Sequence, residues 1–490
     1  MASFTERYHE LTKYNPNTID KLGSVRWDSQ PPAFKSISST EKIDLIPHLQ
    51  AVIDRLQNPA TAPKQREAET GLENIARLLF FTFGLTARFS DQGGGDFFLR
   101  AAPSAGGLYP TEMYVAARNQ NGLPDGLYHY HSLKSALIPV WQGTFWADLK
   151  HYFLGHSAVD ASNLILLFTG IYGRSAWRYK ERAYRRILLD TGHAMGNLLE
   201  VTRQTGQDYS LMGGFLDDGL EELLFLTQKE EFPLLGVAIG PAGTLPKNPG
   251  QRPSDLPEEA IRHLSHEDSG VRDAMQVQQN ACERIRSLEG LRAPVEGSGE
   301  GPIFPSTPEF NALKIILGRR SCRKFNGHSV SLAQLRENLA FTFRTEGNTW
   351  CLASDHLEFH LVALNVAGLE SGIYRFHSET LTLQTRQTGD FKSETYFMCL
   401  GQELASECAY ALVYTTDLAK LAKAYGDRGY RYACMDAGQI GERINLWAIQ
   451  QQLGSSGIGG YYDDKGNELL GLPLSHGILY ITLVGVPEEN

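Results

Sequence analysis

The chain has 490 residues, and its size and charge already exclude some classes of protein. A single hydrophobic core rarely extends beyond roughly 250 to 300 residues, so two or three domains are expected. The 46 lysine and arginine residues and 56 aspartate and glutamate residues give a net charge of −10. Such a balance, without long basic runs, argues against nucleic acid as a partner.

The distribution of apolar residues and cysteines sets further limits. Hydrophobic residues make up 42% of the chain, yet no stretch approaches the ~20 apolar residues that span a bilayer, so we expect no membrane partner. The polar N-terminus lacks the apolar core of a signal peptide, which predicts a cytoplasmic location. The six cysteines form no CxxC pair and none has histidine at zinc-finger spacing, so we expect no metal site.

In chain order, residues 1–65, which include Trp27, Pro31-Pro32 and Phe34, are predicted to form an N-terminal extension. Leu72, Ile75 and Leu79 then mark one face of an amphipathic helix. Alternating β-like runs follow, and a long helix carries Asp190. Residues 243–308 have Pro- and Gly-rich ends around a charged segment, which indicates a linker that contains a helix.

The second half of the chain repeats the first. Gly126-Leu127-Tyr128 recurs 246 residues later as Gly372-Ile373-Tyr374, and Asp190 recurs as Asp436 at the same offset. The segment 213–218 likewise matches 459–464. Near the start of each copy the offset is 260, which places an insertion of 14 residues in the first copy, within the Gly-rich segment 87–100. We therefore predict two α+β domains in tandem, a first copy at 66–242 and a second copy at 309–490.

A basic cluster opens the second copy. Arg319, Arg320, Ser321 and Arg323 lie within five residues, and guanidinium groups with a hydroxyl suit a phosphate dianion. The alternative is a basic patch exposed to solvent, as most charge runs are. The corresponding segment of the first copy, 59–63, has no cation.

A second motif has the opposite distribution. Pro103, Ser104, Ala105 and Gly106 offer small side chains and bare amides against which a flat ring can lie, although an ordinary tight turn would use similar residues. The segment 349–354 of the second copy lacks this character. Each copy therefore keeps one motif and lacks the other. This distribution predicts one cofactor site between the copies, to which each copy contributes one motif.

A glycine loop near the C-terminus and two histidines are further candidates. Gly459 and Gly460 belong to a loop that can present backbone N–H groups to an acceptor, although such glycines also make plain turns. His193 and His360 stand in apolar contexts without a ligand set, and we interpret them as structural.

Together these motifs resemble the nitroreductase-like FMN flavoproteins: RRSCRKF, PSAGGLYP, the helix with YRxxxxDxG and the GxGGY loop. PSAGGLYPTEMYV, GLYHYH and YHELTKYNP are similar to the SagB-type branch, which includes azoline dehydrogenases. In that superfamily two α+β domains form an intimate dimer with FMN at the interface. The resemblance thus implies two tandem nitroreductase-like domains that form an intramolecular pseudo-dimer with one FMN.

The resemblance also implies roles for particular residues. Arg319, Arg320, Ser321 and Arg323 would hold the phosphate and ribityl chain, while Pro103, Ser104, Ala105 and Gly106 would pack on the isoalloxazine. Gly459 and Gly460 would approach flavin N5 and O4. Gln402 would contact the pyrimidine edge.

The chain departs from the branch at a Lys-Tyr pair that azoline dehydrogenases carry. Here the positions are Arg178-Tyr179 in the first copy and Ala424-Tyr425 in the second. Arginine does not act as a base at neutral pH, so Tyr179 is the predicted proton-transfer group, and Arg178 would stabilise negative charge.

Three functions follow as hypotheses. The first is a SagB-type dehydrogenase that oxidises a heterocycle, such as an azoline, by hydride transfer to FMN. The second is an NAD(P)H-dependent reductase of nitro compounds or quinones. The third is a non-catalytic flavin-binding or peptide-scaffolding protein. The expected partner is a small molecule or a modified peptide, and further association of chains stays open.

Overall fold

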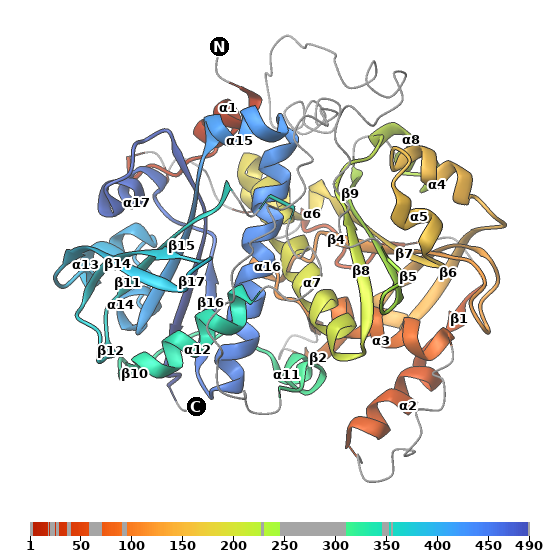
Figure 1. Ribbon diagram of the computed structural model, residues 1–490, viewed down its shortest axis with the longest axis horizontal. Coiled ribbons are helices and arrows are strands. Elements are labelled where there is room, and N and C mark those ends of the chain that lie inside the picture. Colours follow the sequence, from red (N-terminus) through yellow and green to blue (C-terminus); the bar gives the residue numbers. More distant parts are fainter. Residues whose placement is uncertain are drawn as a thin grey trace.

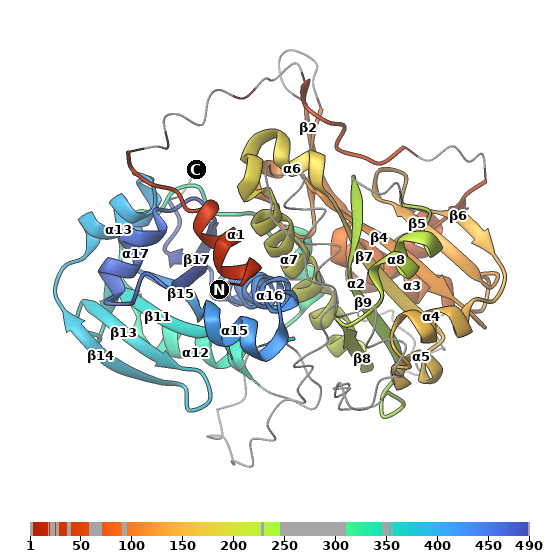
Figure 2. The ribbon, with the colours of Figure 1, turned by 90° about the horizontal axis from the view of Figure 1, so that it is seen from above.

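The chain folds around two long helices that pack side by side, α7 (Ala183–Gln204) and α16 (Arg428–Gln450), with one β-sheet on each side of the pair (Figure 1). This is seen in a computed structural model, and Figure 2 gives the view from above. The residues that the structure describes are 3–17, 19, 25, 29–36, 41–57, 71–90, 96–226, 230–245, 310–344, 352–353 and 356–488.

The N-terminal extension contributes three elements: α1 (Phe4–Leu11), β1 (Ile43–Asp44) and α2 (Ile46–Gln57). The remaining helices of the first copy are α3 (Gly71–Phe83), α4 (Trp146–Tyr152), α5 (Ser157–Ala161), α6 (Tyr172–Tyr179) and α8 (Asp217–Leu223), with 3₁₀ turns η4 (Ala105–Gly107), η5 (Ser132–Lys134) and η6 (Lys180–Arg182). Its strands are β2 (Leu85–Ser90), β3 (Asp96–Arg100), β4 (Thr111–Ala117), β5 (Gly126–His131), β6 (Ala136–Gln142), β7 (Leu164–Ile171), β8 (Gln207–Met212) and β9 (Glu231–Pro241).

The second copy repeats this order of elements. Its other helices are α11 (Ala312–Gly318), α12 (Leu332–Phe343), α13 (Lys392–Met398), α14 (Leu404–Glu407), α15 (Leu418–Tyr425) and α17 (Asp463–Leu470). Its strands are β10 (Val330–Ser331), β11 (Glu358–Ala363), β12 (Val366–Ala367), β13 (Gly372–His377), β14 (Thr382–Thr388), β15 (Tyr410–Asp417), β16 (Gly454–Ile458) and β17 (His476–Gly485).

The two sheets have the same topology. The first has the order β1-β6-β5-β4-β7-β9-β8 and the second β14-β13-β11-β15-β17-β16, so that β1 of the extension is the one addition. Neighbouring strands in both are antiparallel. The tandem α+β architecture is confirmed. The β2–β3 hairpin stands outside the main sheet, within the segment where the insertion was predicted.

Both sheets are covered on two faces, which explains their apolar central strands. One continuous core joins the inner faces of the sheets to α7 and α16. Separate clusters lie under α4, α5 and α8 in the first copy and under α13, α14 and α17 in the second. A strand such as β7, with seven successive buried residues, fits this double cover rather than an alternating pattern.

Two glycines let the central helices cross closely. A Cβ at Gly192 would lie 2.1 Å from the carbonyl oxygen of Met435, and one at Gly438 would lie 2.3 Å from that of Leu189. These are equivalent positions of the two copies, so the contact is reciprocal, as at the interface of a symmetric dimer. The glycines of the repeat are therefore required by the approach of the two helices.

Buried ion pairs repeat this reciprocity. Arg182 and Arg185 of the first copy each contact Asp463 of the second at 2.8 Å. At the equivalent positions, Arg428 contacts Asp217 at 2.8 Å and Arg431 contacts it at 3.5 Å. All six side chains are buried. Burial opposes ionisation of Asp463, but the two guanidinium groups outweigh it and lower the pKa of this carboxyl.

The extension binds both copies. Thr5 donates its backbone N–H to Asp427 at 3.0 Å in the second copy, and Tyr8 donates its hydroxyl to the carbonyl of Glu181 at 2.8 Å in the first. Figure 2 shows α1 lying across the ends of α15 and α16.

Several predictions concern residues that the structure does not describe. The predicted linker at 243–308 lies outside the described residues except for 243–245, as do the segments 59–63 and 349–351, and the predicted domain boundaries stay predictions. Within the described ranges, no helix combines the length and apolar character that crossing a membrane requires.

Candidate functional site

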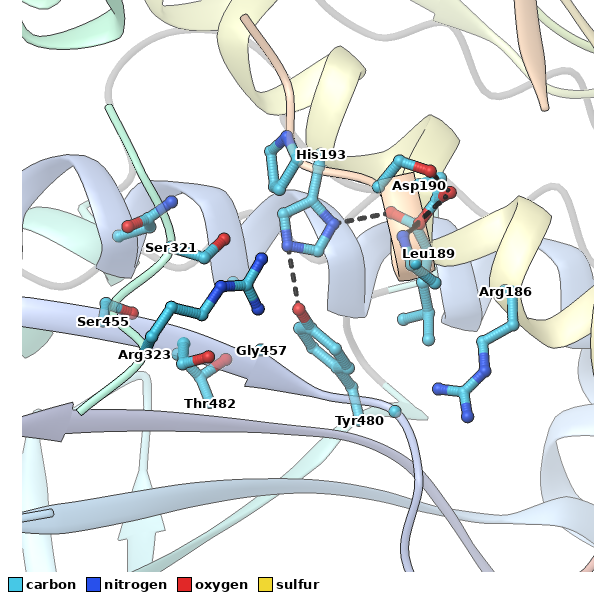
Figure 3. Close-up of a pocket in the computed structure, with 18 residues that line it drawn as sticks. Arg186, Leu189, Asp190, His193, Ser321, Arg323, Ser455, Gly457, Tyr480 and Thr482 are labelled. Carbon is cyan, nitrogen blue, oxygen red and sulfur yellow. Dashed lines mark hydrogen bonds between the residues drawn. The ribbon is translucent and has the colours of Figure 1, made fainter. Parts of the chain in front are cut away.

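A cavity lies between the copies beside the contact of α7 and α16 (Figure 3). Its empty space amounts to about 770 Å³ when it is counted out to the open mouth. Seven residues predicted from the sequence line it, four from one motif and three from the second copy. They are Pro103, Ser104, Ala105, Gly106, Ser321, Arg323 and Gly459. The structure thus brings the two complementary motifs to one place.

Asp190 fixes the segment of the first copy that lines the cavity. Its carboxylate accepts the hydroxyl of Ser104 at 2.5 Å and the backbone N–H of Ala105 at 3.0 Å. Burial raises the pKa of Asp190 to about 7, although these hydrogen bonds oppose the shift. Gly106 follows with φ of 64°, a left-handed conformation that favours glycine.

Small and hydroxyl-bearing residues form the second-copy wall. Ser455, Ser456 and Thr482 line the cavity together with Gly441 and Gly457. A Cβ at Gly457 would lie 1.7 Å from the hydroxyl of Tyr480, so this glycine leaves room for the tyrosine. Such a wall supplies hydroxyl groups to a polar chain and bare backbone to a close neighbour.

His193 and Tyr480 form a hydrogen-bonded pair in the cavity. His193 Nδ1 lies 2.7 Å from the carbonyl oxygen of Leu189 and therefore carries the proton, so Nε2 accepts the Tyr480 hydroxyl at 3.0 Å. Burial lowers the pKa of His193 to about 4, which keeps the ring neutral. The expectation that His193 is structural missed its place in this wall. His360 instead lies on β11, with Nε2 3.0 Å from a nitrogen of Arg375.

Two arginines line the cavity, one near each end of the labelled set in Figure 3. The guanidinium of Arg323 is directed toward His193 and Tyr480. Arg186 lies over the ring of Tyr179, with its guanidinium carbon 4.9 Å from the ring centroid. Sequence reasoning missed Arg186, which has Tyr432 as its counterpart in the second copy.

Two other predicted cations point elsewhere. Arg319 is buried and donates to the carbonyls of Ala101, at 2.8 Å, and Arg100, at 3.3 Å, in the first copy. Arg320 donates to the carbonyl of Arg319 at 2.6 Å and contacts Thr86 at 3.4 Å. Both tie the opening of the second copy to the first, and neither is among the residues that line the cavity.

Gln402 and Gly460 lie next to the cavity rather than in its lining. The amide nitrogen of Gln402 donates to the carbonyl of Cys399 at 2.8 Å and lies 3.5 Å from the carbonyl oxygen of Gly460. The loop at Gly459 approaches the first copy, since a Cβ there would lie 1.3 Å from a nitrogen of Arg186.

Tyr179 and Arg178 stand at the edge of the cavity, beside Gly106. A Cβ at Gly106 would lie 2.8 Å from the Tyr179 hydroxyl and 3.2 Å from a nitrogen of Arg178. Burial raises the pKa of Tyr179, while Arg186 and Arg178 oppose the shift. The phenol therefore keeps its proton at neutral pH.

The profile of the Nitroreductase family matches the chain twice, at residues 71–241 and 316–486. Because these matches cover well over half of its length, the chain belongs to the nitroreductase family of oxidoreductases. The solved structure of a putative nitroreductase from Anabaena variabilis is 32% identical, with a TM-score of 0.82 and full coverage of both chains.

Two curated relatives match one part of the chain each. A putative nitroreductase of Methanocaldococcus jannaschii is 25% identical over 169 residues, which are 34% of this chain and 80% of that protein. The microcin B17-processing protein McbC of Escherichia coli is 27% identical over 150 residues, 29% of this chain. That match spans 54% of the length of McbC.

Proposed function

We propose that this protein is an FMN-dependent oxidoreductase of SagB type that oxidises a heterocycle, such as an azoline in a modified peptide, with one FMN per chain. The observation that carries the proposal is the cavity between the copies, which joins Pro103–Gly106 of the first copy to Ser321 and Arg323 of the second. The similarity to McbC supports the SagB-type assignment.

The residues at the cavity fit FMN. Within the described part of the chain, Arg186 lines the cavity and its Nε is buried without a hydrogen-bond partner, as a cationic donor beside an anionic ligand would be. Hydroxyl groups line one wall, and the absence of a Cβ at Gly457 and Gly459 makes room there for the side chains of Tyr480 and Arg186.

Different residues of the chain would bind the phosphate, the ribityl chain and the ring of FMN. Arg323 and Ser321 would hold the phosphate, since they supply a cation and a hydroxyl at the second-copy wall. Ser455, Ser456 and Thr482 would bind the ribityl hydroxyls. Pro103, Ser104, Ala105 and Gly106 would lie against the ring, held in place by Asp190. Gly459 would face the polar edge of the ring.

FMN held by these residues would supply two-electron redox chemistry, namely uptake of a hydride from the substrate and reoxidation by oxygen, which is reduced to hydrogen peroxide. Oxidation of an azoline also releases a proton, which Arg178 cannot accept at neutral pH and which would pass to solvent water at the open mouth of the cavity. Tyr179 keeps its own proton, so its hydroxyl would donate a hydrogen bond that orients the substrate.

The state of Tyr179 also favours a second candidate, an NAD(P)H-dependent reductase of nitro compounds or quinones. Reduction of such acceptors requires protons, and the Tyr179 phenol is protonated at neutral pH, although its raised pKa makes it a weaker acid than an ordinary tyrosine. The similarity to putative nitroreductases is consistent with this candidate.

One experiment separates the candidates. The FMN-loaded protein is mixed anaerobically with a thiazoline-containing peptide or, separately, with NADPH or NADH, and the flavin absorbance is followed. The proposal predicts bleaching by the peptide and a product lighter by two hydrogen atoms. Bleaching by NAD(P)H alone, with turnover of a quinone, would favour the reductase, and a chain that binds no FMN would exclude both.

Tyr179→Phe tests the role of the phenol. We expect kcat/KM to fall roughly a hundredfold, the lower end of the range for a lost proton-transfer group. Because the pKa of Tyr179 lies above its ordinary value, the wild-type rate should lose this contribution only in the alkaline range. An unchanged pH profile in the variant would contradict the assignment.

A further inference from the structure

A second cavity of about 520 Å³, again counted to its mouth, lies beside the first. One side of it comes from the N-terminal extension, including Lys13 and Tyr14. The other side comes from the end of α6 and η6, including Trp177, Tyr179 and Lys180. It has no part in the binding of FMN described above.

Tyr179 forms a shared boundary of the two cavities. Its side chain lines the second cavity, while its hydroxyl reaches the space beside Gly106, which lines the first. Arg182 makes a similar link, because it lines the second cavity and donates to the carbonyl of Gly459 at 3.4 Å. The two cavities are therefore neighbours, with Tyr179 and Arg182 between them.

The extension forms a fixed wall. The backbone N–H of Tyr14 donates to Asp463 at 3.1 Å, and the guanidinium of Arg182 lies 4.3 Å from the centre of the Tyr14 ring. Lys13 forms ion pairs at 2.8 Å with Glu10 and with Asp464 of the second copy. These contacts hold the aromatic ring of Tyr14 in place before any ligand binds.

The lining combines aromatic rings with positive charge. Tyr14, Trp177 and Tyr179 supply flat surfaces, and the cations Arg178 and Lys180 have exposed side chains at this wall. Lys13 and Arg182 are already paired with carboxylates, and Glu181 is the one acidic residue of the lining. The exposed ammonium group of Lys180 suits an anionic group next to a ring.

The backbone of Lys180 is strained in a way that its counterpart avoids. Lys180 has φ of 48° and ψ of −128°, a region that is nearly confined to glycine. The equivalent residue of the second copy is Gly426, with φ of 61° and ψ of −161°. The same turn thus closes α6 and α15, but the first copy keeps a lysine there, at the wall of the second cavity.

We infer that the second cavity binds a remote, anionic part of the substrate that carries a flat ring, and that Lys180 contacts its negative charge. This inference rests on the proposed function, because the reacting part of the same substrate would lie in the first cavity. Binding energy from such a remote part can position the reacting part.

The test is calorimetric titration of the FMN-loaded protein with benzoate and with its neutral analogue benzyl alcohol. We expect benzoate to bind at least fivefold more tightly, and Lys180→Gly to remove this preference. Lys314→Ala, which removes an exposed lysine of α11, serves as the control for charge and should keep it.

Three outcomes are decisive. Because glycine relieves the strain, Lys180→Gly should melt at the same or a higher temperature, so a loss of benzoate binding would not reflect misfolding. Equal affinity for the two probes, or benzoate binding unaffected by Lys180→Gly, would overturn the inference. A chain that binds no FMN would instead refute the proposed function, and the same titration of that FMN-free chain would still report on the second cavity.

Discussion

The two copies keep one frame but have different residues at equivalent places beside the central helices. Gly441, Asn445 and Gly457 line the cavity, and their counterparts at the 246-residue offset are Met195, Leu199 and Leu211, all buried in the core. Arg186 has Tyr432 as its counterpart, whose ring would lie 2.7 Å from a Cβ at Gly213. The residues that line the cavity are thus small or polar, and their counterparts in the other copy are large and mostly apolar.

The features that the copies share form the frame, by which we mean the contacts that hold the two copies together as a pseudo-dimer. Asp190 holds the segment at Ser104 and Ala105, and Asp436 does the same for Leu352 and Ala353, whose backbone N–H groups donate to it at 2.9 Å and 2.6 Å. The buried arginine–aspartate clusters are likewise reciprocal. The comparison separates residues that maintain the pseudo-dimer from residues that serve the proposed FMN site.

The largest effect is expected from breaking the frame. Asp463→Ala leaves Arg182 and Arg185 buried without their carboxylate, and Asp217→Ala does the same to Arg428 and Arg431. Each change should lower the free energy of unfolding by about 3–5 kcal/mol. Urea unfolding followed by circular dichroism measures this. A loss of less than about 1 kcal/mol of unfolding free energy in one of the two variants would show that the two arginine–aspartate clusters do not contribute equally to stability.

The next effect concerns the filling of the cavity. Gly457→Leu gives the second copy the residue that the first has at Leu211, and the new side chain would collide with Tyr480. FMN affinity should fall roughly a hundredfold, equivalent to about 3 kcal/mol. Equilibrium dialysis with FMN reports the change.

Its matched control is Leu211→Gly, which should destabilise the core and leave the number of bound FMN molecules unchanged. Normal FMN affinity in Gly457→Leu would show that the flavin binds elsewhere.

A smaller effect tests the predicted phosphate contact. Arg323→Ala should weaken FMN about tenfold, because an exposed cation contributes less than a buried one, and should leave riboflavin, which lacks the phosphate, unaffected. Lys324→Ala is the control, since Lys324 pairs with Glu488 at 2.7 Å. If the variant binds FMN and riboflavin more weakly by the same factor, Arg323 does not contact the phosphate.

Much of the fold could be predicted from the sequence because the repeat aligns glycines, aspartates and apolar strands at one offset. The meeting of the Pro103 segment with Ser321 and Arg323 was predicted by the same route. The directions of Arg319 and Arg320 could not be predicted, because they depend on carbonyl acceptors more than 200 residues away. His193 and Tyr480 were missed since each stands in an apolar stretch. Their counterparts Gln439 and Leu235 differ in size or polarity, which a residue-by-residue comparison of the copies would have revealed.

The most direct test of one working site in a duplicated frame is the FMN content of the purified chain. The chain is saturated with FMN, freed of excess ligand and denatured, and the released flavin is measured by absorbance against protein concentration from amino-acid analysis. We predict one FMN per chain. Two FMN per chain would contradict the divergence of the copies, and none would contradict the proposed cofactor site.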